Sequence, residues 1–375
     1  MPPAPNTTLR LALIGPGLVG SAFLAQLAAA APTLRSNRDL DIRLVALANS
    51  SRCVTDEAGL DPGAGAAALL AAPSATPASL PALAAFLAAC PRPTVLVDCT
   101  SGPTIPDALY ASSLAAGVSV VTPNKAFAAG AAAPHAAALA AAAASGARYA
   151  GEATVGAGLP ILSTLAALVD TGDTVRRIEG VFSGTLGFLF SSLEADPARP
   201  FSAIVADAKA AGYTEPDPRD DLSGADVARK AVILARAAGV TELEVDRVDV
   251  ASLVPPNLAD PALSPDAFLA GLASHDAAMA AKAQEAAAKG EVLRYVAAVD
   301  VGAGSASVRL ASVPAAGHPL SGLAGAENAF AFVTDRYPEG SALVVRGPGA
   351  GAAVTAAGIL GDVLGVVARA AGGRV

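Results

Sequence analysis

The fold is decided by residues 9–21, which read LRLALIGPGLVGS. Leu9 to Ile14 form a short apolar run bounded by turn residues, a pattern typical of a buried parallel strand. The next six residues match G-x-G-x-x-G, and residues 21–31 then predict a helix. A strand, this glycine motif and a helix in direct succession are typical of a dinucleotide-binding turn.

Each glycine of the turn has a separate physical task. Gly15 permits the tight turn, Gly17 lets a pyrophosphate approach the backbone, and Gly20 lets the helix pack closely on the strand. The N–H groups of Leu18 and Val19 then face the anion at the positive end of the helix. A glycine-rich turn without a ligand is the alternative, and the flanking strand and helix favour the ligand.

The second predicted strand, residues 42–48, ends without the carboxylate that usually binds the ribose of NAD. The chain continues as Asn49-Ser50-Ser51-Arg52, and Arg52 could contact a 2′-phosphate instead. This strand end favours NADP slightly over NAD. A polar turn that simply ends the strand explains the same residues equally well.

Two further strands are predicted at residues 94–98 and 118–121, with a short helix inside 73–93 and another helix over 106–117. The strands end at Thr100-Ser101 and at Asn124-Lys125, on the edge where open α/β sheets bind ligands. A lone lysine is usually solvated, but one at such a strand end is a candidate site residue. Together these elements predict an α/β fold with a Rossmann-type doubly wound parallel sheet.

The composition excludes several classes of protein. The chain has 375 residues, a net charge of −8 and no cluster of Lys and Arg that would bind nucleic acid. Alanine, a weakly apolar residue, is the commonest of the hydrophobic residues that make up 53% of the chain, so no membrane-spanning helix is predicted. Three cysteines without C-x-x-C spacing predict neither disulfides nor a zinc site and fit a reducing cytoplasm. The charged and apolar start resembles a signal peptide, but the strand and glycine turn explain it better.

A second glycine-rich segment, GEATVGAGLP, spans residues 151–160. Its glycines allow backbone carbonyls to turn inward, and Glu152 adds a carboxylate oxygen, a ligand set that suits a hard cation. A hinge between domains explains the same segment. A strand is predicted over residues 177–182, followed by Ser183-Gly184-Thr185.

The densest group of charges lies in residues 212–230, which read GYTEPDPRDDLSGADVARK. The prolines exclude a helix up to Pro218, and a helix is predicted from Ser223 to about residue 238. Ser223 and Asp226 have the spacing of a capping box, and Asp226 and Lys230 that of an i,i+4 ion pair. A capped helix with one surface ion pair explains the helix but not the acids crowded before it.

We interpret these charges as a site for an amino-acid substrate. Carboxylates such as Glu215, Asp221 and Asp226 can hold an ammonium and a hydroxyl group. Lys230, partly desolvated among the acids, can donate and accept the proton that accompanies hydride transfer.

At this point the sequence resembles a known family. Residues 212–230 are similar to the characteristic segment of homoserine dehydrogenases, and the resemblance extends along almost the whole chain. It includes GPGLVG at 15–20, VTPNKA at 121–126, EATVGAGLP at 152–160, EGVFSGTL at 179–186 and GPGAGAAVTAAG at 347–358. The first motif is common to many dehydrogenases, whereas the others together are specific.

The resemblance implies an NAD(P)-dependent oxidoreductase that reversibly reduces L-aspartate 4-semialdehyde to L-homoserine in threonine, methionine and isoleucine biosynthesis. It implies a cytoplasmic homodimer of the short monofunctional form, similar to the fungal type, without room for a regulatory domain. The expected domains are a nucleotide-binding domain at 1–150, a dimerisation and catalytic domain at 151–340, and a C-terminal segment at 341–375. That segment would form a helix over about 352–370 and return to the nucleotide domain.

The resemblance also assigns roles to individual residues. Lys230 would be the acid/base residue, and Lys125 would be a second lysine at the reacting oxygen and the nicotinamide. Substrate would be bound by Glu215, Asp221, Asp226 and Lys230, and the cofactor by the glycine turn with Thr100, Ser101 and Gly351. A monovalent cation, usually sodium, would be bound by Glu152 and the carbonyls of Val155, Ala157 and Leu159. His318 matches a loop near the substrate.

Two other functions compete with this one. A semialdehyde dehydrogenase that forms an acyl phosphate needs an activated cysteine, and Cys53, Cys90 and Cys99 all fall in the nucleotide half without a nearby histidine. A non-catalytic dinucleotide-binding redox sensor would have no need of Lys230 beside Asp226.

Overall fold

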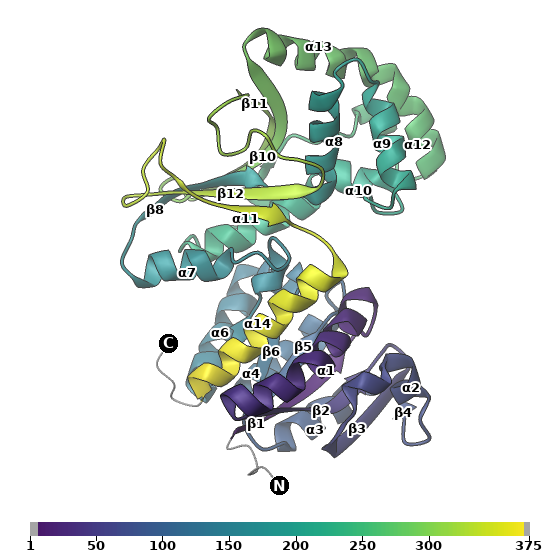
Figure 1. Ribbon diagram of the computed structural model, residues 1–375, viewed down its shortest axis with the longest axis vertical. Coiled ribbons are helices and arrows are strands. Elements are labelled where there is room, and N and C mark those ends of the chain that lie inside the picture. Colours follow the sequence, from purple (N-terminus) through teal and green to yellow (C-terminus); the bar gives the residue numbers. More distant parts are fainter. Residues whose placement is uncertain (1–6, 371–375) are drawn as a thin grey trace. The chain divides into compact units, whose positions relative to one another are not determined.

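The computed structural model describes residues 7–370, and contacts divide the chain into two compact units. Unit 1 combines the residues up to Gly158 with those from Gly351 onward, and unit 2 spans Leu159–Ala350. Each unit contains one sheet with helices packed on it (Figure 1).

The sheet of unit 1 has the strand order β4-β3-β2-β1-β5-β6-β7. Its strands are β1 Thr7–Ile14, β2 Leu40–Ala48, β3 Arg52–Leu60, β4 Thr76–Pro77, β5 Thr94–Asp98, β6 Ser119–Val121 and β7 Tyr149–Ala150. Five of them, from β2 to β7 in this order, are parallel, which confirms the Rossmann-type prediction. Strand β3 and the edge strand β4 are antiparallel and were not predicted, because the charged segment after Arg52 lacks an apolar run.

Helices cover both faces of this sheet. They are α1 Leu18–Arg38, α2 Ala66–Ala71, α3 Leu80–Ala89, α4 Ala111–Ala115 with a preceding π-helical turn Pro106–Tyr110, α5 Lys125–Ala128, α6 Ala132–Ser145 and α14 Ala352–Ala370. Side chains alternate along β1, so that Leu11 and Leu13 join one core with α1 and α14, while Ala12 and Ile14 join another with α3, α4 and α6.

The last helix of the chain packs beside the first. Figure 1 shows α14, in yellow, along α1, in purple, and the side-chain amide of Gln26 donates a 2.7 Å hydrogen bond to the carbonyl of Ala353. Ala356, Ile359 and Val363 are fully buried in the shared core. The C-terminal segment therefore completes the sheet domain that the N-terminal segment begins.

Unit 2 contains a six-stranded, mainly antiparallel sheet with the order β13-β12-β8-β10-β11-β9. Its strands are β8 Val175–Val181, β9 Asp249–Val250, β10 Glu291–Asp300, β11 Ser305–Pro314, β12 Glu327–Thr334 and β13 Leu343–Pro348. Its helices are α7 Leu162–Asp170, α8 Gly184–Ala195, α9 Phe201–Ala210, α10 Pro218–Leu222, α11 Ala225–Ala237, α12 Pro265–Leu272 and α13 Asp276–Ala288. Helices α8, α11 and α13 pack on β10.

Two helix predictions were wrong at their ends. Helix α1 continues through Pro32 to Arg38, beyond the expected end at residue 31, and stops where Asp39 adopts a left-handed conformation with φ 53°. The helix predicted from Ser223 is α11, which begins at Ala225, because Gly224, with φ 77°, is its N-cap and separates it from α10, a short helix that was not predicted. The expected capping box therefore does not form. Among residues 7–370, none of the helices combines the length and apolar character needed to cross a bilayer.

Candidate active site

The cavity at the carboxyl ends of β1 and β5 is the candidate dinucleotide site of unit 1. These strands are neighbours in the sheet, yet the chain leaves them toward opposite faces, the arrangement that opens a crevice in doubly wound folds. The cavity has a volume of about 1260 Å³. The predicted cofactor residues that line it are Gly15, Gly17, Thr100 and Ser101.

The three glycines of the turn have the surroundings that their predicted tasks require. Gly15 has φ 80°, and a Cβ there would lie 2.7 Å from the Thr100 methyl group. A Cβ at Gly20 would lie 2.5 Å from the Gly15 carbonyl oxygen, whereas a Cβ at Gly17 would meet no atom within 4 Å. The turn is thus tightly packed at its two ends and open at Gly17, where a pyrophosphate would approach.

Helix α1 begins directly behind this opening. Leu18 and Val19 are its first residues, and the N–H groups of a first helical turn lack helical acceptors. The N-cap, Gly17, contributes no side-chain cap. These N–H groups, at the positive end of a 21-residue helix, therefore suit an anion.

The end of β2 carries no acid, as the sequence indicates. Asn49 and Ser50 line the cavity, and none of the described residues that line it is a carboxylate. Arg52 does not line the cavity: its guanidinium donates a 2.7 Å hydrogen bond to the Ala75 carbonyl. Contact between Arg52 and a 2′-phosphate stays a prediction.

Lys125 lies at the end of β6, as expected, and is the first residue of α5. It is half-buried. The preceding Asn124 caps this helix by accepting a 3.0 Å hydrogen bond from the Ala126 N–H. Gly351, the other predicted cofactor residue, directly precedes α14 with φ 120°, a backbone conformation that favours glycine.

The predicted cation segment contains an unusual backbone. Gly156 has φ 77° and Ala157 has φ 55°, and Ala157 is one of two non-glycine residues with positive φ within residues 7–370. Two successive left-handed residues redirect the neighbouring carbonyl groups, which fits a ligand set made mainly of backbone oxygens. Leu159 is the first residue of unit 2, and its carbonyl accepts a 2.9 Å hydrogen bond from the Ile161 N–H.

Glu152, the one carboxylate of that ligand set, is anchored through its backbone. Its N–H donates a 2.8 Å hydrogen bond to the carboxylate of Asp362 on α14. Burial raises the pKa of Asp362 to about 7. Within the described part of the chain, no three His, Cys, Asp or Glu side chains converge on a possible metal site, so a cation would depend on carbonyl oxygens.

Unit 2 brings the predicted lysine and its acid together. Lys230 and Asp226 lie one turn apart on α11, with 2.9 Å between Nζ and the carboxylate. The same Nζ donates a 2.8 Å hydrogen bond to the Phe182 carbonyl at the end of β8. The side chain of Lys230 is 12% exposed and that of Asp226 is 41% exposed. The ammonium group is therefore more buried than the carboxylate with which it pairs.

The acidic residues before α11 have different surroundings. Asp217 caps α10 and forms an ion pair with Arg219, which gives it a structural role. Asp221 instead accepts a 2.8 Å hydrogen bond from the Glu215 N–H. Burial raises the pKa of Asp221, and the negative charges of Glu215 and Asp226 raise it further. The structure thus places the three predicted substrate carboxylates close enough that the charges of Glu215 and Asp226 act on Asp221.

Thr185 was noted in the sequence but received no role there. It lies in the first turn of α8, and its hydroxyl donates a 2.6 Å hydrogen bond to the Tyr213 carbonyl. A short hydroxyl residue directly after a predicted strand was the available signal. Tyr213 follows 28 residues later, so sequence spacing alone could not reveal the contact.

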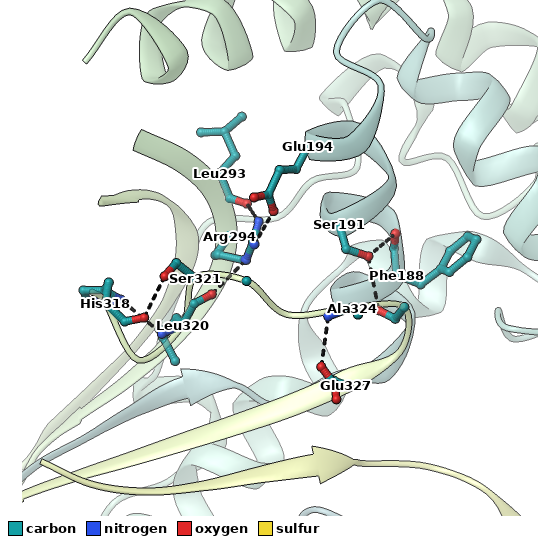
Figure 2. A network of polar contacts seen from close by, with 12 residues as sticks. Phe188, Ser191, Glu194, Leu293, Arg294, His318, Leu320, Ser321, Ala324 and Glu327 are labelled. Atoms are coloured by element: carbon teal, nitrogen blue, oxygen red, sulfur yellow. Dashed lines mark hydrogen bonds and ion pairs between the residues drawn. The ribbon is translucent and has the colours of Figure 1, made fainter. Parts of the chain in front are cut away.

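His318 belongs to a loop anchored by a buried arginine (Figure 2). Its Nδ1 accepts a 3.2 Å hydrogen bond from the Leu320 N–H, and its carbonyl accepts one from the Ser321 hydroxyl. Arg294, 1% exposed, donates to the Leu320 carbonyl at 2.9 Å and pairs with Glu194. The hydrogen bonds of His318 thus stabilise the turn to which it belongs. A role near the substrate stays a prediction.

Family comparisons match nearly the whole chain. The model described as "Homoserine dehydrogenase" matches residues 160–364, and that described as "Homoserine dehydrogenase, NAD binding domain" matches residues 15–152. Homoserine dehydrogenase of Saccharomyces cerevisiae is 41% identical over 363 residues, which cover 96% of this chain and 98% of the yeast protein. A crystal structure of a Candida auris protein of unknown function has a TM-score of 0.88 and 39% identity, and covers 96% of this chain and 99% of that one.

Plant relatives are longer. The bifunctional aspartokinase/homoserine dehydrogenase 2 of Zea mays is 44% identical over 362 residues, which cover 96% of this chain but 38% of the maize protein. The chain thus spans less than half of that relative.

The fold and the glycine turn define a Rossmann-type NAD(P)-binding protein. The chain belongs to the homoserine dehydrogenase family, and its likeness to the fungal type, predicted from the sequence, is confirmed.

Proposed function

We propose that this chain catalyses the reversible NAD(P)-dependent conversion of L-aspartate 4-semialdehyde to L-homoserine. The observation that carries the proposal is Lys230, held 2.9 Å from Asp226 and 2.8 Å from the Phe182 carbonyl beside further acids. An ammonium group fixed by two oxygen acceptors in a largely buried position is suited to deliver a proton to a developing alkoxide.

The residues of unit 2 bind and protonate the substrate. Glu215, Asp221 and Asp226 hold its ammonium and hydroxyl groups, and the positive charge of the substrate offsets the repulsion among them. In the direction of reduction, bound NAD(P)H supplies the hydride to the aldehyde carbon. Lys230 donates a proton to the aldehyde oxygen as the carbon–oxygen double bond becomes a single bond, and recovers it in reverse.

Unit 1 supplies the cofactor site and the second lysine. The cofactor pyrophosphate is bound at Gly15, Gly17, Gly20 and the N–H groups of Leu18 and Val19, with Thr100, Ser101 and Gly351 nearby. Lys125 stabilises negative charge on the reacting oxygen. NADP is slightly preferred to NAD, because the end of β2 lacks the acid that usually binds the ribose of NAD.

A monovalent cation, sodium by preference, is bound by Glu152 and the carbonyls of Val155, Ala157 and Leu159. Its support is the left-handed backbone at Gly156 and Ala157. Sodium should raise the melting temperature relative to choline at equal ionic strength, by a margin that Glu152→Ala removes. Equal melting temperatures in the two salts would contradict the site.

We further propose that the enzyme acts as a cytoplasmic homodimer. The absorbance of the nicotinamide during L-homoserine oxidation, measured in parallel with NAD and NADP, distinguishes an enzyme from a non-catalytic redox sensor. The proposal expects turnover with at least one cofactor. Cofactor binding without turnover would instead favour a non-catalytic sensor.

A further inference from the structure

Asp98, at the end of β5, is a buried carboxylate to which the sequence gave no role. Its side chain is fully buried. One carboxylate oxygen accepts hydrogen bonds from the Thr100 N–H at 2.8 Å and the Thr100 hydroxyl at 2.7 Å. The other accepts from the Tyr110 hydroxyl at 2.7 Å and the Asn124 side-chain amide at 3.3 Å. Four donors from three segments therefore converge on one carboxylate.

The same segments are joined by a second set of bonds. The Thr122 hydroxyl donates to the Asp98 carbonyl at 2.8 Å and accepts from the Asn124 N–H at 2.9 Å. The Asn124 amide also donates to the Gly102 carbonyl at 2.8 Å. These bonds tie the loop after β5 to the loop after β6.

The donors require a side chain that only accepts hydrogen bonds. Tyr110 is fully buried, and burial, followed by the charge of Asp98, raises its pKa, so its hydroxyl remains a donor. The Thr100 N–H and the Asn124 amide are also donors. Each carboxylate oxygen accepts from two donors. If Asp98 were an amide, its own N–H group would face two of these donors, and a buried donor without an acceptor lowers the free energy of unfolding.

We propose that Asp98 is a positioning residue for the cofactor end of unit 1. It fixes Thr100, which lines the dinucleotide cavity, and Asn124, which caps α5 and thereby sets the direction of Lys125. The role of Lys125 in this inference rests on the proposed function, whereas the role of Thr100 requires only dinucleotide binding.

The test compares Asp98→Asn with Thr94→Val by NADPH fluorescence titration, melting temperature and steady-state kinetics. Thr94 is a matched control, because it is buried at the opposite end of β5, where its hydroxyl donates to the Pro91 carbonyl at 2.8 Å. Asp98→Asn should raise the Kd for NADPH and lower kcat, each about tenfold or more. The KM for L-homoserine should stay within about twofold, since unit 2 binds the substrate. Thr94→Val should lower the melting temperature comparably and leave the Kd unchanged.

The outcomes separate this inference from the proposed function. Wild-type affinity for NADPH in Asp98→Asn, or equal loss of affinity in Thr94→Val, would overturn the positioning role. A wild-type protein that binds NADPH without oxidising L-homoserine would instead refute the proposed function, and the binding comparison would still decide the role of Asp98. If Asp98→Asn does not fold, Tyr110→Phe removes one donor and keeps the carboxylate. It should weaken NADPH about threefold, and unchanged affinity would overturn the proposal.

Discussion

Gly17 has no side chain, and the space that a Cβ would occupy there is open to a ligand. The space beside it is open, while the same space at Gly20 is filled by the Gly15 carbonyl. Gly17→Ala should therefore fold with nearly wild-type stability and bind NADPH at least about tenfold more weakly. Gly20→Ala should lower the free energy of unfolding by roughly 1–3 kcal/mol, because the helix must move away from the turn.

Urea unfolding and NADPH fluorescence measure the two effects separately. Wild-type NADPH affinity in a folded Gly17→Ala variant would contradict the assignment of the open space to the pyrophosphate. The exposed helical glycine Gly361, which has no atom within 4 Å of its Cβ position, is the control. Gly361→Ala should bind NADPH like the wild type.

The sequence predicts site residues well where the chemistry is local. The spacing of Asp226 and Lys230 places both on one helix face, and the structure has them 2.9 Å apart. Asp98 and Thr185 were missed, because their partners Asn124 and Tyr213 lie 26 and 28 residues away. Contacts of that kind depend on strand order and helix packing, which no local pattern encodes.

At the scale of an element, Asp41 connects the start of β2 to the last turn of α1. Its side chain is 6% exposed and pairs with Arg35 at 2.6 Å and with Arg43 at 2.7 Å. Burial alone would raise the pKa of Asp41, but hydrogen bonds from Arg43 and Arg35 outweigh it and lower the pKa. The carboxylate is therefore favoured in the folded state, and its contribution is present above the unfolded pKa and lost as pH falls through the folded pKa.

Asp41→Asn should accordingly lower the free energy of unfolding by about 1 kcal/mol near neutral pH, a value moderated by the exposure of both arginines. The difference from the wild type should shrink as the pH falls from about 4 toward the lowered pKa. Urea unfolding as a function of pH measures it. A difference that is constant with pH would show that the charge of Asp41 does not contribute.

The loop after β11 depends on a buried ion pair. Arg294 is 1% exposed, and its partner Glu194 on α8 is 33% exposed in its side chain (Figure 2). Glu194→Leu should lower the free energy of unfolding by roughly 2–3 kcal/mol, because it leaves a buried guanidinium without its counter-charge. Adding Arg294→Met should restore most of that loss, since the uncompensated charge is then removed.

A double-mutant cycle by urea unfolding tests this pair. The exposed pair Arg309–Asp249 is the control, and Asp249→Leu should have a small effect, because solvent screens the charges. Additive losses in the double variant would contradict the account, because independent losses imply that the charges do not interact.

Element prediction succeeded where the hydrophobic pattern was strong. The buried parallel strands, such as Thr94–Asp98, and the final helix, Ala352–Ala370, appear with the expected bounds or close to them. Strand β3 was missed, since most of its residues are exposed and include charged side chains, so that it lacks an apolar run. The end of α1 was misplaced because tertiary packing keeps the helix intact around Pro32.

At the scale of the molecule, the chain returns at its end to the unit in which it began. Gln26 and Ala353 are 327 residues apart and in hydrogen-bond contact, a pairing that only the family resemblance could predict. Ending the chain after Ala350 would remove Gly351 and expose the core around Ile359. The shortened chain should melt at a lower temperature and lose measurable NADPH binding. Retained wild-type affinity would show that α14 is dispensable for the cofactor site.

The central claim is that Lys230 carries the proton during hydride transfer. Its most direct test is kcat for L-homoserine oxidation in the wild type, Lys230→Ala and Lys289→Ala. Lys289 forms an i,i+4 ion pair like that of Lys230, but its side chain is 57% exposed rather than 12%. The account predicts a fall in kcat of about 10²–10⁴-fold for Lys230→Ala and wild-type turnover for Lys289→Ala. Wild-type kcat in Lys230→Ala would contradict it and assign the proton to another group, with Lys125 the first to test.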